Sequence, residues 1–267
     1  MNNTNNLYEK LNLTVDNATV KYNNGNVAIY DASFNINGGS ICGLIGINGS
    51  GKSTLFKLIM GFISPVKGKV TLNDMSIKTA IKNNLIAYVP QTEDIDWNFP
   101  VLVSDVVMMG RYGKMGILRI PNKQDKNVVN HSLKLVELTG LENRQIGELS
   151  GGQKKRVFLA RALAQEGKVL LLDEPFAGVD IKTEHVIISL LSSLRNMGYL
   201  ILISTHNLDS IPSFCDNIIL IKRTILASGP IKSTFTQKNL QLTFGGTSNY
   251  FNLFFNKNNK DTQLSII

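Results

Sequence analysis

A glycine-rich turn between a predicted strand and a predicted helix is the most informative stretch of this sequence. The turn is Gly46–Ser53 (GINGSGKS); the apolar stretch Ser40–Ile45 (SICGLI) precedes it, and Lys52–Met60 continues with apolar residues at helical spacing. The turn matches the pattern G-x-x-x-x-G-K-S in the strand–turn–helix setting that this pattern requires. The stretch therefore predicts binding of a nucleoside triphosphate, without showing which class of NTPase the chain belongs to.

The chemistry of such a turn depends on its backbone. Small residues let successive N–H groups converge on phosphate oxygens, and the amino terminus of the following helix adds the positive end of its dipole. Lys52 is predicted to reach the β- and γ-phosphates, and the Ser53 hydroxyl to hold Mg²⁺. A glycine turn with a chance Lys-Ser pair is the competing interpretation, and it leaves the flanking strand and helix unexplained. The predicted nucleotide contacts here are Gly46, Asn48, Gly49, Ser50, Gly51, Lys52, Ser53 and Thr54.

The composition is that of a globular protein. The chain has 267 residues, 43% of them hydrophobic, which is enough for one domain with a subdomain. Its formal charge of +8 raises the question of whether the chain binds nucleic acid. Because Lys and Arg are spread along the chain and are not interleaved with aromatic residues, no nucleic-acid partner is predicted, and a basic surface beside anionic lipid headgroups fits at least as well. Cys42 and Cys215 lie in apolar segments and are expected to be buried, reduced thiols.

The sequence lacks the pattern of a membrane-spanning helix or a secretion signal. Met1–Asn6 is polar, and apolar runs reach only about five residues where a spanning helix needs roughly 20. We therefore expect a soluble chain whose role at a membrane passes through a partner.

The order of the expected elements indicates an α/β domain. Strand–helix alternation predicts a P-loop NTPase with a mostly parallel core sheet, an N-terminal antiparallel β part and an inserted helical subdomain at about residues 92–149. We expect a flexible N-terminus over residues 1–10, a nucleotide-binding domain over 11–235 and a C-terminal tail over 236–267. The expected strands are Leu11–Tyr22, Val27–Ile36, Ser40–Ile45, Gly68–Leu72, Leu85–Val89, Val169–Leu172, Leu200–Ser204 and Ile218–Ile221, and the expected helices are Lys52–Met60, Asp125–Leu138, Gly151–Ala164 and Ile181–Asn196.

Two carboxylates follow a buried strand. Asp173 and Glu174 come directly after Val169–Leu172, and ligands gather at the carboxyl ends of parallel strands, so both acids are expected to face the phosphate turn. Asp173 suits the coordination of Mg²⁺, and Glu174 suits acceptance of a proton from the attacking water. Taken alone, a solvated strand end before a turn explains the pair equally well.

A second anion site is predicted at Leu149–Gln153 (LSGGQ). Ser150 is a good N-cap for the helix that follows, and Gly151 and Gly152 offer free backbone N–H groups. Two phosphate sites at opposite ends of one chain suggest a head-to-tail pair in which each subunit completes the pocket of the other. A capped helix start without a ligand is the competing interpretation.

Together these segments resemble the ABC transporter ATPases. The resemblance covers roughly residues 11–229, and its motifs occur in the order of that family: Gly46–Ser53, Gln91, Leu149–Gln153, Asp173 with Glu174, Ala177–Asp180 and His206. It implies a domain that binds and hydrolyses ATP with Mg²⁺, with two ATP molecules held between two copies of the chain.

The resemblance also implies a role for each remaining motif residue. Ser150 and Gly152, flanked by Gly151 and Gln153, would contact the γ-phosphate of ATP bound to the opposite subunit. Gln91 would sense Mg²⁺ and the attacking water, and His206 would bind the γ-phosphate and position Glu174. Asp180 would carry contact between the two active sites. Tyr22 would stack on adenine, although a tyrosine at a sheet edge is nearly as good an explanation.

The segment after Gln91 is similar to one class of transporter ATPase. The similarity is to the ATPases of manganese, zinc and chelated-iron importers, and it lies in Thr92–Pro100, Val106–Gly113 and Gly116–Arg119. Manganese is the transported metal that this similarity implies first. This similarity implies an integral permease docked on the helical subdomain, a separate metal-binding protein, and a peripheral location on the cytoplasmic face of the membrane. Trp97 and Phe99 would form an apolar pocket for the permease or, in the alternative, fill the core of the subdomain.

Two other classes compete with a transporter subunit. Soluble ABC proteins of DNA repair or the ribosome commonly carry two cassettes or a long coiled-coil insertion, which this chain lacks. A nucleotide-binding module without turnover is the other class, and the presence of Asp173, Glu174 and His206 speaks against it.

Overall fold

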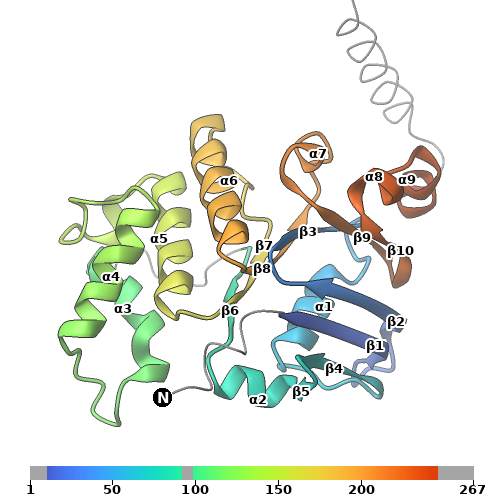
Figure 1. The fold of residues 1–267 in the computed structure, drawn as a ribbon, viewed down its shortest axis with the longest axis horizontal. Coiled ribbons are helices and arrows are strands. Elements are labelled where there is room, and N and C mark those ends of the chain that lie inside the picture. The colour runs from blue at the N-terminus through green and yellow to red at the C-terminus, as the bar shows by residue number, and fades with distance from the viewer. Residues whose placement is uncertain (1–10, 92–98, 246–267) are drawn as a thin grey trace, which may run out of the picture.

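A computed structural model of the chain describes residues 11–91 and 99–245. The larger of its two sheets has six strands in the order β10-β9-β3-β8-β7-β6 (Figure 1). Neighbouring strands in this sheet are parallel, except that β10 runs antiparallel to β9. The prediction of a mostly parallel core sheet is therefore confirmed. The strands are β3 (Ser40–Ile45), β6 (Ile86–Val89), β7 (Val169–Asp173), β8 (Leu200–Thr205), β9 (Asn217–Lys222) and β10 (Thr224–Pro230).

The smaller sheet is antiparallel and has the order β2-β1-β4-β5. Its first two strands alternate buried and exposed residues, as expected for a sheet that buries one face. Helix α1 (Lys52–Ile59) contributes Leu55 and Phe56 to a core shared with Leu13 of β1 and Leu44 of β3, so both sheets hold the helix that follows the glycine-rich turn. The strands are β1 (Asn12–Lys21), β2 (Val27–Asn37), β4 (Lys67–Leu72) and β5 (Met75–Ser76).

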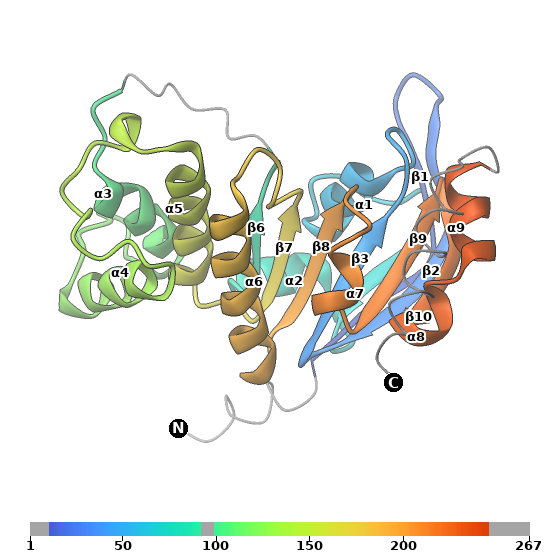
Figure 2. The same ribbon diagram turned by 90° about the horizontal axis from the view of Figure 1, so that it is seen from above.

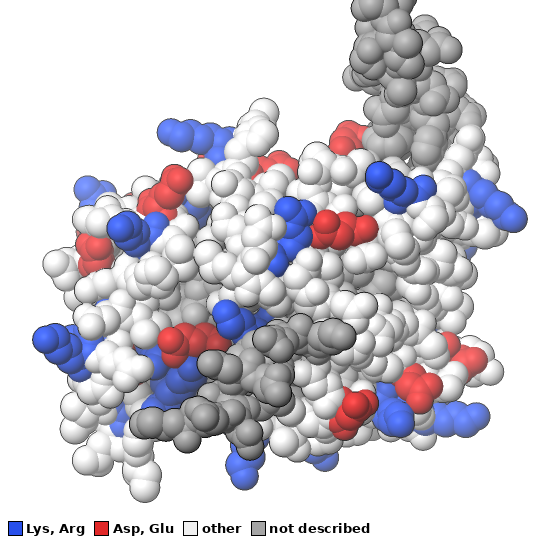
Figure 3. Space-filling model, in the orientation of Figure 1, with Lys and Arg blue, Asp and Glu red and all other residues white. Residues whose placement is uncertain are grey.

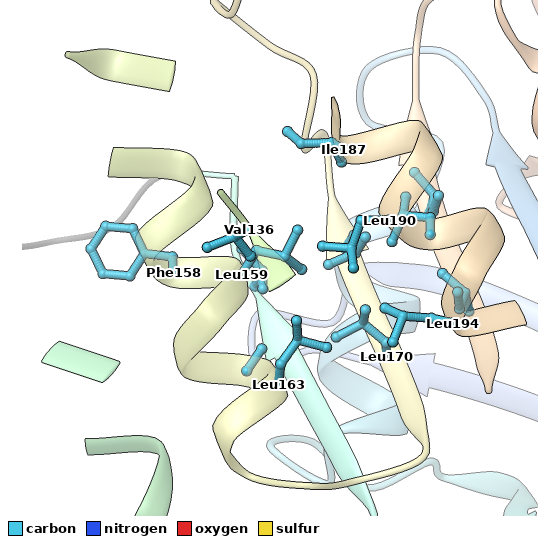
Figure 4. Close-up of a cluster of buried hydrophobic side chains, with 14 of the residues drawn as sticks. Val136, Phe158, Leu159, Leu163, Leu170, Ile187, Leu190 and Leu194 are labelled. Carbon is cyan, nitrogen blue, oxygen red and sulfur yellow. The ribbon is translucent and has the colours of Figure 1, made fainter. Parts of the chain in front are cut away.

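Helices α3, α4 and α5 gather at one end of the molecule, beside α6 (Figures 1 and 2). The side chains of Leu159 and Leu163 in α5 point toward Leu170 of β7 and toward Leu190 and Leu194 of α6 (Figure 4). The helical end therefore shares the apolar core of the large sheet. These helices are α3 (Val103–Met108), α4 (Lys123–Leu135), α5 (Gly151–Ala164) and α6 (Ile181–Asn196).

A buried arginine fastens the helical end together. Arg111, in the short helix η2 (Met109–Lys114), donates to Asp125 of α4 at 3.1 Å, to the Ala164 carbonyl at 2.9 Å and to Glu166 at 2.5 Å. A buried guanidinium is costly unless its N–H groups are paired, and these partners satisfy Nε and Nη1.

The bounds of α4 differ from those expected from apolar periodicity. The helix begins at Lys123 because Asn122 and Asp125 form a capping box, in which each side chain accepts from the backbone of the other. It ends at Leu135 instead of Leu138, since Glu137 has a left-handed backbone with φ of 56°.

Short helices outside the prediction complete the fold: α2 (Ile77–Lys82), α7 (Ile211–Phe214), α8 (Ile231–Thr234) and α9 (Gln237–Phe244). The expected tail, residues 236–267, therefore starts with a packed helix, whose Leu240 is fully buried in the main core. Trp97 lies outside the described residues. Phe99 is 63% exposed, so it does not fill the core of the helical part. Cys42 and Cys215 are buried and free, as expected.

The surface carries mixed charge on the face shown in Figure 3, where Lys and Arg are interspersed with Asp and Glu. Over residues 11–91 and 99–245, no helix combines the length and the apolar character needed to cross a membrane.

Candidate functional site

A cavity of about 640 Å³ lies at the carboxyl ends of the core strands. Its lining joins the glycine-rich turn, the residues after β6 and β7, and His206 after β8, as expected for a ligand site in a parallel sheet. The lining residues are Tyr22, Asn26, Val27, Ala28, Asn48, Gly49, Gly51, Lys52, Ser53, Thr54, Gln91, Asp173, Glu174, His206 and Arg223.

The glycine-rich turn packs tightly against the end of β9. A Cβ atom on Gly46 would lie 2.4 Å from the carbonyl oxygen of Ile221 and 2.4 Å from Oγ of Ser50, so this position excludes any side chain. Ser50 is buried, and its hydroxyl has no hydrogen-bond partner among residues 11–91 and 99–245. The turn is thus fixed from behind by the sheet, while its other side lines the cavity.

Lys52 is a largely buried cation at the start of α1. Its Nζ donates to the carbonyls of Gly46 at 2.7 Å and Ile47 at 3.1 Å. Burial lowers the pKa of this lysine below its ordinary value, and the nearby carboxylates of Glu174 and Asp173 partly oppose that shift. The cavity therefore brings one ammonium group opposite two carboxylates.

Asp173 is the last residue of β7 and is buried. Its Oδ1 accepts a hydrogen bond from the Ser204 hydroxyl in the neighbouring strand β8. Burial raises the pKa of Asp173, and the Glu174 charge raises it further, whereas the bond from Ser204 and the Lys52 charge act in the opposite direction. The carboxyl is thus held rigidly at the strand end and would gain from a cation beside it.

Glu174 contacts two other predicted residues of the site, Gln91 and His206. Its backbone N–H donates to Oγ of Ser204 at 3.0 Å and to the Ser204 carbonyl at 3.2 Å, with φ of 49°. Its Oε2 accepts from Nε2 of Gln91 at 2.8 Å and lies 3.4 Å from Nδ1 of His206. The Glu174 side chain is 11% exposed and that of His206 is 65% exposed, so the carboxylate lies inside the cavity and the imidazole at its mouth.

Tyr22 lines the cavity on the side of the smaller sheet. Its hydroxyl shares a hydrogen bond of 3.0 Å with Oγ1 of Thr54, which fixes the ring beside α1. Four further lining residues were not predicted: Asn26, Val27, Ala28 and Arg223. The first three follow Tyr22 into β2, so the predicted hairpin could have indicated them. Arg223 lies in the turn between β9 and β10, and no sequence motif marks it.

The predicted second anion site lies apart from this cavity. Ser150 caps α5 in a capping box with Gln153, with bonds of 2.9 and 3.3 Å. Gly152 packs against Thr183, which donates to the Asp180 carboxylate from both its backbone N–H and its hydroxyl, each at 2.9 Å. These bonds hold the pKa of Asp180 below its usual range. Neither the Ser150 segment nor Asp180 lines the cavity of the same chain.

Comparison with known proteins now decides the family. The model of the family described as "ABC transporter" matches residues 29–177, which is more than half of the chain. The chain belongs to the ABC transporter family. It is accordingly an ATP-binding ATPase domain of that family, and the predicted P-loop NTPase fold is confirmed. The roles of the individual motif residues stay predictions.

Similar ABC proteins match this chain over most of its length. It is 68% identical over 241 residues to the chelated iron transport system membrane protein YfeB of Yersinia pestis, covering 90% of this chain and 81% of that protein. It is 59% identical over 237 residues to the manganese transport system ATP-binding protein MntA of Synechocystis sp., covering 89% and 91%. The ADP conformation of MJ1267, an ATP-binding cassette of an ABC transporter, superposes with a TM-score of 0.77 at 27% identity, over 88% of this chain and 99% of that one.

Proposed function

We propose that this ABC protein hydrolyses ATP to drive uptake of a transition metal through a separate permease. Two relatives that match about nine-tenths of the chain are named for transport of chelated iron and of manganese, which supports this proposal. Manganese and chelated iron are the leading cargoes, and zinc comes next. The cargo passes through the permease, and this subunit supplies the energy.

The grouping of Gln91, Glu174 and His206 opposite Lys52 carries the proposal of hydrolysis. Lys52 would hold the β- and γ-phosphates, which brings the γ-phosphate toward the Glu174 carboxylate in the same cavity. Glu174 would accept a proton from the attacking water while Gln91 orients that water. His206, 3.4 Å from Glu174, would bind the γ-phosphate and hold Glu174 in place.

Mg²⁺ fits the oxygen donors of this cavity. Ser53 offers a hydroxyl and Asp173 a carboxylate. The amide N–H of Gln91 donates to Glu174, so the amide oxygen of Gln91 is left to act as a ligand. Hard oxygen donors are the ligands that Mg²⁺ prefers, and its charge would neutralise the phosphates during transfer. The raised pKa of Asp173 agrees with a carboxylate arranged to face a cation.

The separation of the two anion sites supports a head-to-tail dimer. The Ser150 helix start lies outside the cavity of its own chain, so it would reach ATP only on a second copy. There Ser150, Gly151 and Gly152 would bind the γ-phosphate with N–H groups and a hydroxyl. ATP would then close the dimer, and hydrolysis would reopen it.

The permease would dock on the helical end formed by α3, α4 and α5. Phe99, at 63% exposed, borders this end and is available to a partner, as are Ile117 and Leu118. We place the subunit on the cytoplasmic face of the membrane as a peripheral protein, with a metal-binding protein acting on the far side of the permease.

Metal accumulation in the organism of origin tests the proposal. Cells that lack this chain are supplied with the wild-type protein or with Glu174→Gln, and uptake of radioactive manganese and iron is measured. We expect loss of uptake of one metal, restored by the wild type and not by the variant, because the amide cannot accept a proton. Normal accumulation of both metals without the chain, or full rescue by Glu174→Gln, would contradict the proposal.

A further inference from the structure

Helix α5 is tied to the core strand β6 at both of its ends. Near the start of the helix, Nζ of Lys155 donates to the backbone carbonyl of Gln91 at 2.9 Å. Just past its end, Nε2 of Gln165 donates to the carbonyl of Ile86 at 2.8 Å. Ile86 begins β6 and Gln91 follows the end of that strand, so helix α5 and strand β6 run in opposite directions. The Lys155 bond therefore lies at the edge of the sheet that carries the cavity.

The residue after Lys155 makes a different kind of contact. Arg156 donates to the carbonyls of Val136 at 2.9 Å and Glu137 at 3.2 Å, the two residues that follow the end of helix α4. Successive residues of a helix point about 100° apart, so neighbours can serve separate partners. Arg156 thus fastens α5 to the helical end, and Lys155 fastens it to the segment that holds Gln91.

The position of the Gln91 backbone determines what its side chain can reach. Pro90 before it has a fixed φ, and Lys155 holds the Gln91 carbonyl, so the Gln91 backbone is constrained on both sides. That side chain donates to Oε2 of Glu174 at 2.8 Å. A continuous set of contacts therefore runs from α5 through Lys155 and Gln91 to Glu174.

We infer that Lys155 is a positioning residue for ATP hydrolysis, which transmits the position of α5 to Gln91 and through it to Glu174. The inference rests on the proposed function, in which the Ser150 end of α5 grips ATP on the second copy. Fixing that end fixes Lys155 in the next turn of the same helix. Hydrolysis in one cavity would then depend on ATP bound in the other, which is a coupling between two sites.

The test compares Lys155→Met with Lys155→Arg. The methionine variant keeps the unbranched side chain as far as Cε and removes the donor, so we expect kcat for ATP to fall about 10- to 100-fold through misplacement of Gln91. Cooperativity in ATP concentration should fall with it, while KM and the unfolding temperature stay at wild-type values. Arginine also donates and should restore most of kcat. Lys134→Met, at an exposed position of α4, is the matched control and should keep wild-type kcat.

The outcomes separate this inference from the proposed function. Wild-type kcat in Lys155→Met would overturn the inference, and so would equal losses in the methionine and arginine variants or a loss that follows a lower unfolding temperature. The double variant Lys155→Met with Glu174→Gln should still pair in Mg-ATP, since Lys155 acts on catalysis and not on closure. Failure of the wild-type protein itself to hydrolyse ATP would count against the proposed function instead.

Discussion

Lys52 gives the nucleotide site a measurable dependence on pH. Its pKa lies below the usual 10.5 because burial disfavours the ammonium form. Phosphate oxygens favour that form, so ATP should raise the pKa again. At a pH between the two pKa values, binding must take up a proton, and ATP affinity must fall as the pH rises through the lower value. We expect uptake of up to about one proton per site at alkaline pH and little near neutrality.

Calorimetry in two buffers of different ionisation enthalpy measures this uptake. Lys52→Arg should abolish it, because a guanidinium stays charged throughout the range. Lys57→Arg, on the exposed side of the same helix, should leave it unchanged. The same proton uptake in Lys52→Arg and in the wild type would assign the titration to another group.

Single residues of the site differed in how well sequence could predict them. Gln91 and His206 are ordinary loop residues when taken alone, and only their order among the other motifs marked them. The structure adds the contacts of both with Glu174, at 2.8 and 3.4 Å. Arg223 was missed because the β9–β10 turn reaches the cavity only once the sheet has folded. There the backbone N–H of Arg223 donates to the Ser50 carbonyl at 2.7 Å.

At the scale of elements, the start of α5 combines two adjacent glycines with different surroundings. A Cβ on Gly152 would lie 2.8 Å from Oγ1 of Thr183, whereas a Cβ on Gly151 would meet nothing within 4 Å. Gly152→Ala should therefore push Thr183 from Asp180 and destabilise the nucleotide-free chain by about 1–3 kcal/mol. Gly151→Ala should be neutral or slightly stabilising, since alanine is the better helix former.

Denaturant unfolding of the two glycine variants without nucleotide checks this difference. Equal stabilities would show that Gly152 is not required for packing against α6. In that case the glycine at this position would be explained by its predicted contact with phosphate.

Elements were predictable where burial imposes a pattern and were missed where it does not. β7 is buried at every residue and was evident as an apolar run, whereas the edge strand β10 alternates partly exposed residues and ends in Gly229-Pro230. Helix α9 has Leu240 and Thr243 as its buried residues, among Gln, Asn and Lys, which is too few for a periodic signal.

At the scale of the whole molecule, alternation of strands and helices predicted a parallel sheet but not the order of its strands. β3 lies between β8 and β9, which follow it by more than 150 residues. This crossover brings Lys52, Asp173 and His206 to one cavity. Local propensity carries no information about such pairings, because each core strand is equally apolar and could pair with any other.

Because the Ser150 helix start is separate from the Lys52 cavity, the proposed function requires two chains to pair on ATP. The most direct test of this pairing is the mass in solution of Glu174→Gln, which should bind ATP without consuming it. With Mg-ATP we predict a particle of twice the 29.5 kDa chain, and without Mg-ATP, or with Lys52→Ala added, a single chain. A variant that remains a single chain in saturating Mg-ATP, both alone and on its permease, would contradict the claim.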